Sequence, residues 1–547
     1  MSSTIDGTQA LRFSAEVRTA ADDLVQRLEQ LNAIGASLSA ERDLNRLLET
    51  ILTAAKSITR ADGGTLYRLT EDRTLRFEIL RTSSLRYYLG GTTGNAVPFY
   101  PIHLIGKDGK PNHSMVAAYA ALTGKTVNIA DAYTADGFDF TGTRNFDKKT
   151  GYRSKSFLTV PMANHENEII GVLQLINAMD PKTGEIVPFS PSDQRLAESL
   201  ASQAAIALTN RMLINQLEQL FESFIAMINT AIDEKSPYTG GHCQRVPALT
   251  MMFAEAVNET EQGPLSDFHM NDKDRYELKI AGLLHDCGKV TTPVHVVDKA
   301  TKLEAIYDRI HLIDTRFEIL KRDAEIAMLK DGSPEARAAY RERLRQIEED
   351  RMFLRAANIG GERMHDDDIA RVQRIAEYRW TDISGHEAKF LSDDELKNLT
   401  IRAGTLTAEE RQIINHHIVA TIKMLEALPW PRHLKNVPEY AGGHHERMDG
   451  KGYPRGLKRE QMSVQARVMG IADIFEALTA KDRPYKKGKT LSESIEILGK
   501  FSLNGHIDPD LFDIFVRRKV YQRYAEMFLD KEQIDEVDES KIPGYVP

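Results

Sequence analysis

The helical hydrophobic pattern that runs from about residue 233 onward constrains the fold most. Four segments, which begin near residues 246, 275, 409 and 464, carry apolar residues spaced three and four positions apart. This spacing places the apolar side chains on one face of an α-helix. The second half of the chain is therefore predicted to be an all-α domain in which each helix buries one face.

The residues before this region mix helical and strand-like patterns. Four short segments rich in Ile, Leu, Val and Phe predict strands, namely "GGTLYRLT", "TLRFEILRT", "SFLTVPMA" and "EIIGVLQLIN". With 547 residues, the chain is too long for one hydrophobic core. We expect a multidomain α+β protein. Its expected parts are an N-terminal helix (1–39), an α+β domain (40–208), a linker helix (209–235), a helical domain (236–525) with a helical insertion at about 300–404, and a polar, loosely held tail (526–547).

Composition limits the location and the partners. No apolar run is long enough to span a bilayer, and the N-terminus lacks the basic start and apolar run of a secretory signal. The two cysteines, Cys243 and Cys287, favour a reducing cytoplasm. A net charge of −9 argues against a nucleic-acid polymer as partner but leaves a small phosphate ligand open. We expect a cytoplasmic protein without a membrane partner.

The expected linker helix carries apolar residues at alternating steps of four and three, which is a heptad pattern. They are Leu213, Leu217, Leu220, Phe224, Met227 and Ala231. The stripe either packs inside one chain or joins two chains in a parallel dimer. We favour the homodimer.

Histidines and carboxylates recur within the helical region. Burying several ionisable groups in one domain is costly unless they are paired or bind a metal, and imidazole and carboxylate are common ligands of divalent iron, manganese and zinc. His285 and Asp286 are adjacent, so that the histidine could bind one ion while the carboxylate bridges two. Lys289, one turn later, would hold a phosphate oxygen. The sequence therefore predicts a metal site that acts on a phosphate ester.

Three motifs, "HDCGK", "HHERMDGKGYP" and "IADIFEALTAKDRPYK", together resemble the HD-GYP subgroup of the HD metal-dependent phosphohydrolases. The resemblance covers residues from about 233 to 525, apart from the insertion. It implies an all-α domain with a dinuclear centre of iron or manganese. It also implies hydrolysis of the second messenger cyclic di-GMP to pGpG or GMP, or of 3′,3′-cyclic GMP-AMP.

The resemblance also implies a role for each matching residue. One metal would be held by His242, His285, Asp286 and Asp473, and the other by Asp286, His417, His444 and His445. Asp286 and Lys289 would be catalytic. The substrate would contact Lys289, Gly452, Tyr453, Pro454, Arg483 and Lys486.

The sequence departs from the family pattern at several positions. The middle histidine is assigned to His417, with His311 as the alternative, because the insertion separates the motifs. Glu476 replaces the usual aspartate. Tyr238 stands where some members have a glutamate for a third metal, so we expect two metals. The pair His365 and Asp366 lacks the downstream Gly-Lys and is interpreted as a solvated turn.

Residues from about 40 to 208 resemble a GAF domain, which implies an antiparallel sheet with flanking helices and a sensor for a small molecule. The resemblance rests on "NIADAY", "DKKTGYRSKSFLTVPM" and "IIGVLQLINAMD". The corresponding positions of the cyclic-nucleotide signature are Asn177, Ala178, Phe189, Asp193 and Gln194. Because the signature lysine is absent, its ion pair to the aspartate cannot form, which weakens the case for a cyclic nucleotide. A dimerising domain without ligand is the alternative, and "FDKKTGYRSK" is either a basic lid or a solvated loop.

Three functions remain open at this point. The first is a cyclic di-GMP phosphodiesterase, or one that prefers 3′,3′-cyclic GMP-AMP, regulated by the N-terminal domain. The second is a catalytically weak receptor for a cyclic dinucleotide. The third is a phosphohydrolase that acts on other nucleotides.

Overall fold

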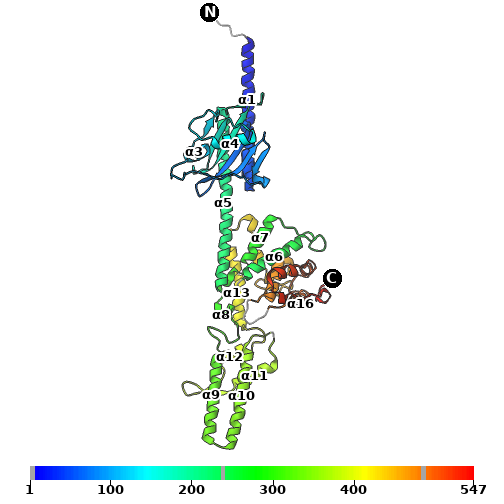
Figure 1. Ribbon diagram of the computed structural model, residues 1–547. Helices are drawn as coiled ribbons and strands as arrows, with labels where there is room; N and C mark the ends of the chain where they lie inside the picture. Colours follow the sequence, from blue (N-terminus) through cyan, green and yellow to red (C-terminus); the bar gives the residue numbers. More distant parts are fainter. Residues whose placement is uncertain (1–6, 236–240, 362, 482–487) are drawn as a thin grey trace. The chain divides into compact units, whose positions relative to one another are not determined.

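The computed structural model describes residues 7–235, 241–361, 363–481 and 488–547. The chain divides into two compact units, residues 1–221 and 222–547 (Figure 1). Within the described ranges, we find no helix that is both long and apolar enough to cross a membrane.

The first unit is built on one antiparallel sheet with the strand order β3-β2-β1-β7-β6-β5, while β4 pairs with β2 and β8 with β7. The strands are β1 (Ala61–Leu69), β2 (Thr74–Thr82), β3 (Tyr87–Gly90), β4 (Ile102–His103), β5 (Val127–Ile129), β6 (Phe157–Ala163), β7 (Ile169–Met179) and β8 (Ile186–Val187). All four strands predicted from the sequence are confirmed.

Helices cover the sheet because successive strand residues face opposite sides. Leu66 of β1 packs into a core with α1 (Gly7–Ala40), α2 (Leu44–Thr59) and α5 (Pro191–Lys235). The next residue, Tyr67, belongs to a second core with α3 (Val116–Thr123). A further short helix, α4 (Thr141–Thr150), precedes β6. The first unit therefore has the predicted arrangement of an antiparallel sheet with flanking helices.

The second unit is predominantly helical, as the sequence predicts. Its helices outside the expected insertion are α6 (His242–Asn258), α7 (Asp272–Leu284), the 3-10 turn η2 (Cys287–Thr291), α8 (Val294–Val297), α13 (Ala408–Glu426), α14 (Val437–Gly442), α15 (Val464–Thr479), α16 (Leu491–Leu503), α17 (Pro509–Arg517) and α18 (Val520–Phe528).

The segment expected to be an insertion has its own hydrophobic core, which runs in sequence from Leu303 to Leu399. Its two long helices form a helical hairpin (Figure 1). A small strand pair is an addition that the sequence did not predict. The elements are α9 (Ile310–Asp331), α10 (Pro334–Asn358), α11 (Asp366–Ala376), β9 (Arg379–Thr381), β10 (Glu387–Lys389) and α12 (Asp393–Leu399).

The chain end differs from the expectation of a loosely held tail. Ile542 and Tyr545 are buried, and the Gln533 side-chain amide donates to the backbone carbonyls of Thr479 and Lys489. The prediction of a loose tail at 526–547 is therefore wrong. A few isolated apolar residues anchor a segment whose average composition is polar.

Candidate metal centre

Helices of the second unit bring all seven predicted metal ligands into one cluster. His242 opens α6, and His417 and Asp473 lie within α13 and α15. The remaining four follow helix ends, where the backbone leaves the helix: His285 and Asp286 after α7, and His444 and His445 after α14.

Backbone carbonyls fix three of the imidazole rings. The Nδ1 atoms of His285, His417 and His444 lie 2.7, 2.6 and 2.6 Å from the carbonyl oxygens of the residues three positions earlier. A carbonyl oxygen only accepts hydrogen bonds, so each Nδ1 must carry the proton and donate it. In the neutral ring, the Nε2 atom then carries the lone pair, which is the form of histidine that binds a metal.

The ligand atoms form two groups that could each hold a metal ion. One contains His242, His285 and Asp473, and the other contains His417, His444 and His445. Asp286 lies between them. Its Oδ2 atom is 3.0 Å from the Nε2 atom of His242, and its Oδ1 atom is 3.2 Å from the Nε2 atom of His417. One carboxylate therefore reaches both groups, as a bridging ligand must.

The ring nitrogens of this cluster lie close together, as ligand atoms around shared cations do. The Nε2 atoms of His242 and His285 are 3.3 Å apart, and those of His417 and His445 are 3.2 Å apart. Among the described residues, His444 Nε2 and Asp286 Oδ1 are buried without a hydrogen-bond partner. Such orphaned acceptors are costly unless an ion completes them. The residues present therefore fit divalent metal ions held by nitrogen and oxygen ligands.

Charge is distributed unevenly over the cluster. Burial and the neighbouring His285 lower the pKa of His444 to about 4, and burial with His444 and His417 holds the pKa of His445 well below its usual value. For Asp286, burial opposes ionisation, but Lys289 and His285 outweigh it and hold its pKa well below the usual range. The histidines after α14 are therefore neutral, which is the form that can bind a metal, while Asp286 is an anion.

Lys289 lies where the sequence predicted it, beside the cluster. The turn η2 directs its ammonium group onto Asp286 Oδ2. Burial alone would lower the pKa of Lys289, but Asp286 and Asp473 raise it. Lys289 is therefore a fixed cation that could contact a phosphate oxygen.

Glu476 has a role that sequence reasoning missed. Its Oε2 atom lies 2.6 Å from the Nδ1 atom of His242, and its Oε1 atom accepts a hydrogen bond from Arg245 Nε and forms an ion pair with Arg245 Nη2. Burial would raise the pKa of Glu476, but His242 and Arg245 lower it to about 2. This buried carboxylate orients His242, as outer carboxylates orient metal-binding histidines. The only signal in the sequence was an acidic residue one helical turn after Asp473.

The loop that follows His445 packs against the ring of this histidine. The ring of Tyr453 stacks on His445 with the ring centroids 4.9 Å apart, and the Tyr453–Pro454 peptide is cis. A side chain on Gly452 would come within 2.4 Å of the backbone nitrogen of Arg447, so only glycine fits there. Glu446 accepts hydrogen bonds from two backbone amides of the loop and braces it.

Helix α13 approaches the cluster closely at another glycine. A Cβ atom on Gly288 would lie 2.1 Å from the carbonyl oxygen of His417, and the Gly288 amide donates to Thr421 Oγ1 at 2.9 Å. The glycine in "HDCGK" therefore allows α13 to place His417 beside Asp286.

The other candidate histidines lie elsewhere. His311 is exposed on α9, His416 is exposed on α13, and His365 is exposed at the start of α11, where Asp366 pairs with Arg402. Of the two alternatives for the middle histidine, His417 is the one in the cluster. Arg483, Lys486 and Tyr238 lie outside the described residues.

Comparisons with known proteins agree with the folds of both the first and the second unit. Residues 43–208 match the family model of the GAF domain, and residues 239–375 and 393–511 match two models of the HD domain. The protein therefore combines a GAF domain with a helical HD region.

The relatives that match include three bacterial phosphodiesterases. A cyclic di-GMP phosphodiesterase of Pseudomonas aeruginosa is 39% identical over 116 residues, which is 21% of this chain and 27% of the relative. The cyclic di-GMP phosphodiesterase of Thermotoga maritima is 34% identical over 120 residues, 22% of this chain and 32% of the relative. The 3′3′-cGAMP-specific phosphodiesterase 3 of Vibrio cholerae is 24% identical over 357 residues, 63% of this chain and 52% of the relative. The matched part of the chain thus covers from about a quarter to about half of the length of these relatives.

Proposed function

We propose that this protein is a metal-dependent phosphodiesterase that hydrolyses cyclic di-GMP to pGpG, GMP or both, under the control of its GAF domain. The observation that carries the proposal is the pair of ligand groups that share Asp286. The cyclic di-GMP phosphodiesterases among the matching relatives support the choice of substrate.

We assign one ion to His242, His285, Asp286 and Asp473, and a second to Asp286, His417, His444 and His445. Bound ions would supply Lewis acidity to the phosphodiester and lower the pKa of the attacking water. Asp286 reaches both ligand groups with its two carboxylate oxygens. Lys289 neutralises charge that develops on the phosphate oxygens.

The proposed metals are iron or manganese, because ligand sets of mixed imidazole and carboxylate suit these ions. We propose two ions rather than three. The loop of Gly452, Tyr453 and Pro454, which packs beside His445, would shape the entrance for the substrate. Arg483 and Lys486 are proposed to contact the phosphates.

Adjacent histidines on α13 provide a matched test. His417→Ala removes a proposed ligand, whereas His416→Ala changes an exposed neighbour. With Mn²⁺ or with Fe²⁺ under anaerobic conditions, we expect His417→Ala to lower turnover of cyclic di-GMP at least about a hundredfold. His416→Ala should remain within about twofold of wild type. Equal activity of the two variants would refute the ligand assignment.

Substrate preference has a second candidate, because the chain is similar over 357 residues to a 3′3′-cGAMP-specific phosphodiesterase. Measuring kcat/KM for both cyclic dinucleotides and separating pGpG from GMP decides between the candidates. Binding of either compound without any product would contradict the enzyme proposal and favour a receptor.

Three further properties belong to this proposal. The domains extend over 40–208 and 236–525, joined by the linker helix at 209–235. The protein acts as a homodimer through that helix. It resides in the cytoplasm, where the two buried cysteines, Cys243 and Cys287, remain reduced as free thiols.

A further inference from the structure

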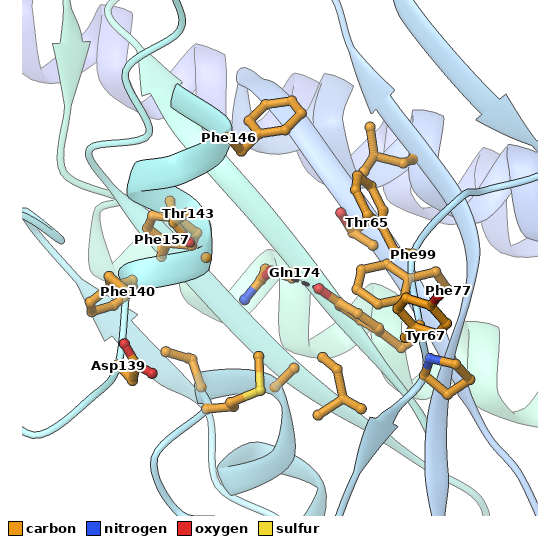
Figure 2. A pocket seen from close by; sticks show the side chains of 18 of the residues that line it. Thr65, Tyr67, Phe77, Phe99, Asp139, Phe140, Thr143, Phe146, Phe157 and Gln174 are labelled. Carbon is orange, nitrogen blue, oxygen red and sulfur yellow. Dashed lines mark hydrogen bonds between the residues drawn. The ribbon is translucent and has the colours of Figure 1, made fainter. Parts of the chain in front are cut away.

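The GAF domain contains a cavity of about 890 Å³ that is lined mainly by apolar side chains, with aromatic rings on two sides (Figure 2). This volume suits a drug-sized ligand. On one side, the ring centroids of Tyr67 and Phe77 are 4.7 Å apart, and those of Phe77 and Phe99 are 5.3 Å apart. On the other side, Phe140 and Phe157 pack with centroids 5.5 Å apart. Two aromatic walls thus enclose a space that suits a flat ring.

A single buried amide, Gln174, lies between the two walls (Figure 2). Its Oε1 atom accepts a hydrogen bond from the Tyr67 hydroxyl at 3.1 Å, and its Nε2 atom donates to Thr159 Oγ1 at 3.1 Å. A primary amide has two protons and two acceptor lone pairs. Among the described residues, these two bonds leave one Nε2 proton and one Oε1 lone pair of Gln174 for a ligand. The proton could be donated to a C=O group of the ligand, and the lone pair could accept from an adjacent N–H group on the same edge of a ring.

The ionisable residues of the described lining, tyrosine apart, lie at the exposed edge of the cavity. They are His103, Lys107 and Asp139, and each of them is exposed. Helix α4 presents Thr143 and Phe146 to the cavity, while its Lys148 and Lys149 are exposed and do not line it. The alternative of a basic lid is therefore wrong for α4. A phosphate inside would lack a counter-charge, which is costly in a buried site.

The positions of the cyclic-nucleotide signature serve the fold instead. Asp193 pairs with Arg27 of α1 and accepts hydrogen bonds from Ser190. Asn177 accepts from the Lys155 amide at 2.7 Å and donates to the Arg153 carbonyl. Neither Asp193 nor Asn177 lines the cavity. Arg27 thus takes the place of the missing lysine as the ion-pair partner of Asp193.

We propose that the GAF cavity binds a neutral, flat aromatic molecule with adjacent N–H and C=O groups, such as a lactam-containing ring, rather than a cyclic nucleotide. The aromatic walls stack on the ring, and Gln174 pairs with its polar edge. The proposal concerns the GAF domain alone and holds whatever reaction the HD region performs.

Charge selectivity is tested with two dyes of the same ring system on the full-length protein. N-phenyl-1-naphthylamine is neutral, and 8-anilino-1-naphthalenesulfonate carries a sulfonate. In equilibrium dialysis, we expect one equivalent of the neutral dye to bind at least about tenfold more tightly than the anion. Excess cyclic GMP or cyclic AMP should not displace it. Equal affinity for the anion, or displacement by either nucleotide, would overturn the proposal.

Site occupancy is tested with matched tryptophan substitutions on α4. Thr143→Trp fills the cavity, whereas Asn145→Trp adds the same side chain at an exposed position outside the lining. We expect Thr143→Trp to abolish binding of the neutral dye and Asn145→Trp to leave it unchanged. Unchanged binding in Thr143→Trp would place the dye elsewhere and contradict the proposal.

Recognition of the polar edge is tested with 2-quinolone and its N-methyl derivative, which lacks the N–H donor. We expect methylation to weaken binding about tenfold in the wild type, because a buried acceptor of Gln174 is left unpaired. In Gln174→Leu, the two compounds should bind equally. If methylation does not change the affinity for the wild-type protein, Gln174 does not form a hydrogen bond with the N–H group of the ligand, which would contradict the proposal.

Discussion

At the scale of single residues, Glu476 connects two parts of the site that are far apart in sequence. Its carboxylate holds both His242 and Arg245. We expect Glu476→Gln to lower metal affinity about 10- to 100-fold, because the His242 ring loses its anionic partner. Isothermal titration of the metal-free protein with Mn²⁺ measures this change.

Glu476→Asp is the matched control, because it keeps the charge on a shorter side chain and restores the residue expected from the family pattern. Its metal affinity should lie between those of wild type and Glu476→Gln. If Glu476→Gln bound Mn²⁺ as tightly as wild type, the carboxylate would not support the ligand.

The residues of the candidate metal cluster could be predicted one by one, because each stands in a short motif that the sequence displays. The role of Glu476 could not be predicted, since it depends on Arg245, which lies 231 positions away. The need for glycine at position 288 was hidden for the same reason. Only the fold shows that α13 approaches that backbone.

At the scale of elements, an ion pair with a buried carboxylate joins α9 to α12 in the insertion. Arg316 donates to both carboxylate oxygens of Glu395 at 2.7 and 3.0 Å, and Glu395 also accepts from the Ser392 amide at the start of α12. We expect Glu395→Gln to destabilise the insertion by about 2 kcal/mol. Hydrogen exchange in α9 and α12 of the full-length protein measures the loss of protection.

Glu409→Gln provides a control, because its partner Lys397 and Glu409 are both more than half exposed. Its effect should lie within about 0.5 kcal/mol. Equal loss of protection in the two variants would show that the burial of Glu395 does not contribute to the stability of the insertion.

The same pair predicts how the stability of the insertion depends on pH. Burial would raise the pKa of Glu395, but hydrogen bonds and charge from Arg316, with the Ser392 amide, lower it below 4.5. A group with a lowered folded pKa stabilises fully above its unfolded value, and this contribution is lost as the pH falls through the folded value. Protection of α9 should therefore be constant above about pH 4.5 and decrease below it in wild type, more steeply than in Glu395→Gln. Parallel pH profiles would contradict this.

Helices and long strands could be predicted because their apolar residues recur with a fixed period. The pair β9–β10 has three residues in each strand, too few to display one. The prediction of a loose tail at the chain end was wrong for a related reason, since Ile542 and Tyr545 are isolated in a polar segment. Their burial depends on surfaces contributed by distant helices.

At the scale of the whole molecule, the apolar stripe of α5 distinguishes the two sequence interpretations. Leu213, Leu217, Leu220, Phe224 and Met227 are between 47% and 64% exposed, so neither unit buries the stripe in its own core. A heptad stripe left open on a long helix is typical of a coiled-coil contact between two copies. This exposure supports the proposed homodimer, which the sequence alone left as one of two alternatives.

The dimer proposal predicts a concentration-dependent dissociation that one substitution shifts. Leu217→Lys puts a charge in the middle of the stripe, and each dimer loses two buried leucines, about 1.5–3 kcal/mol apiece. We expect the dissociation constant to rise at least about a hundredfold. Gln216→Lys adds the same side chain at the neighbouring exposed position and should leave it unchanged. Sedimentation velocity over a range of concentrations measures both variants. A wild-type protein that remains monomeric throughout, or equal shifts in the two variants, would show that α5 does not join two copies.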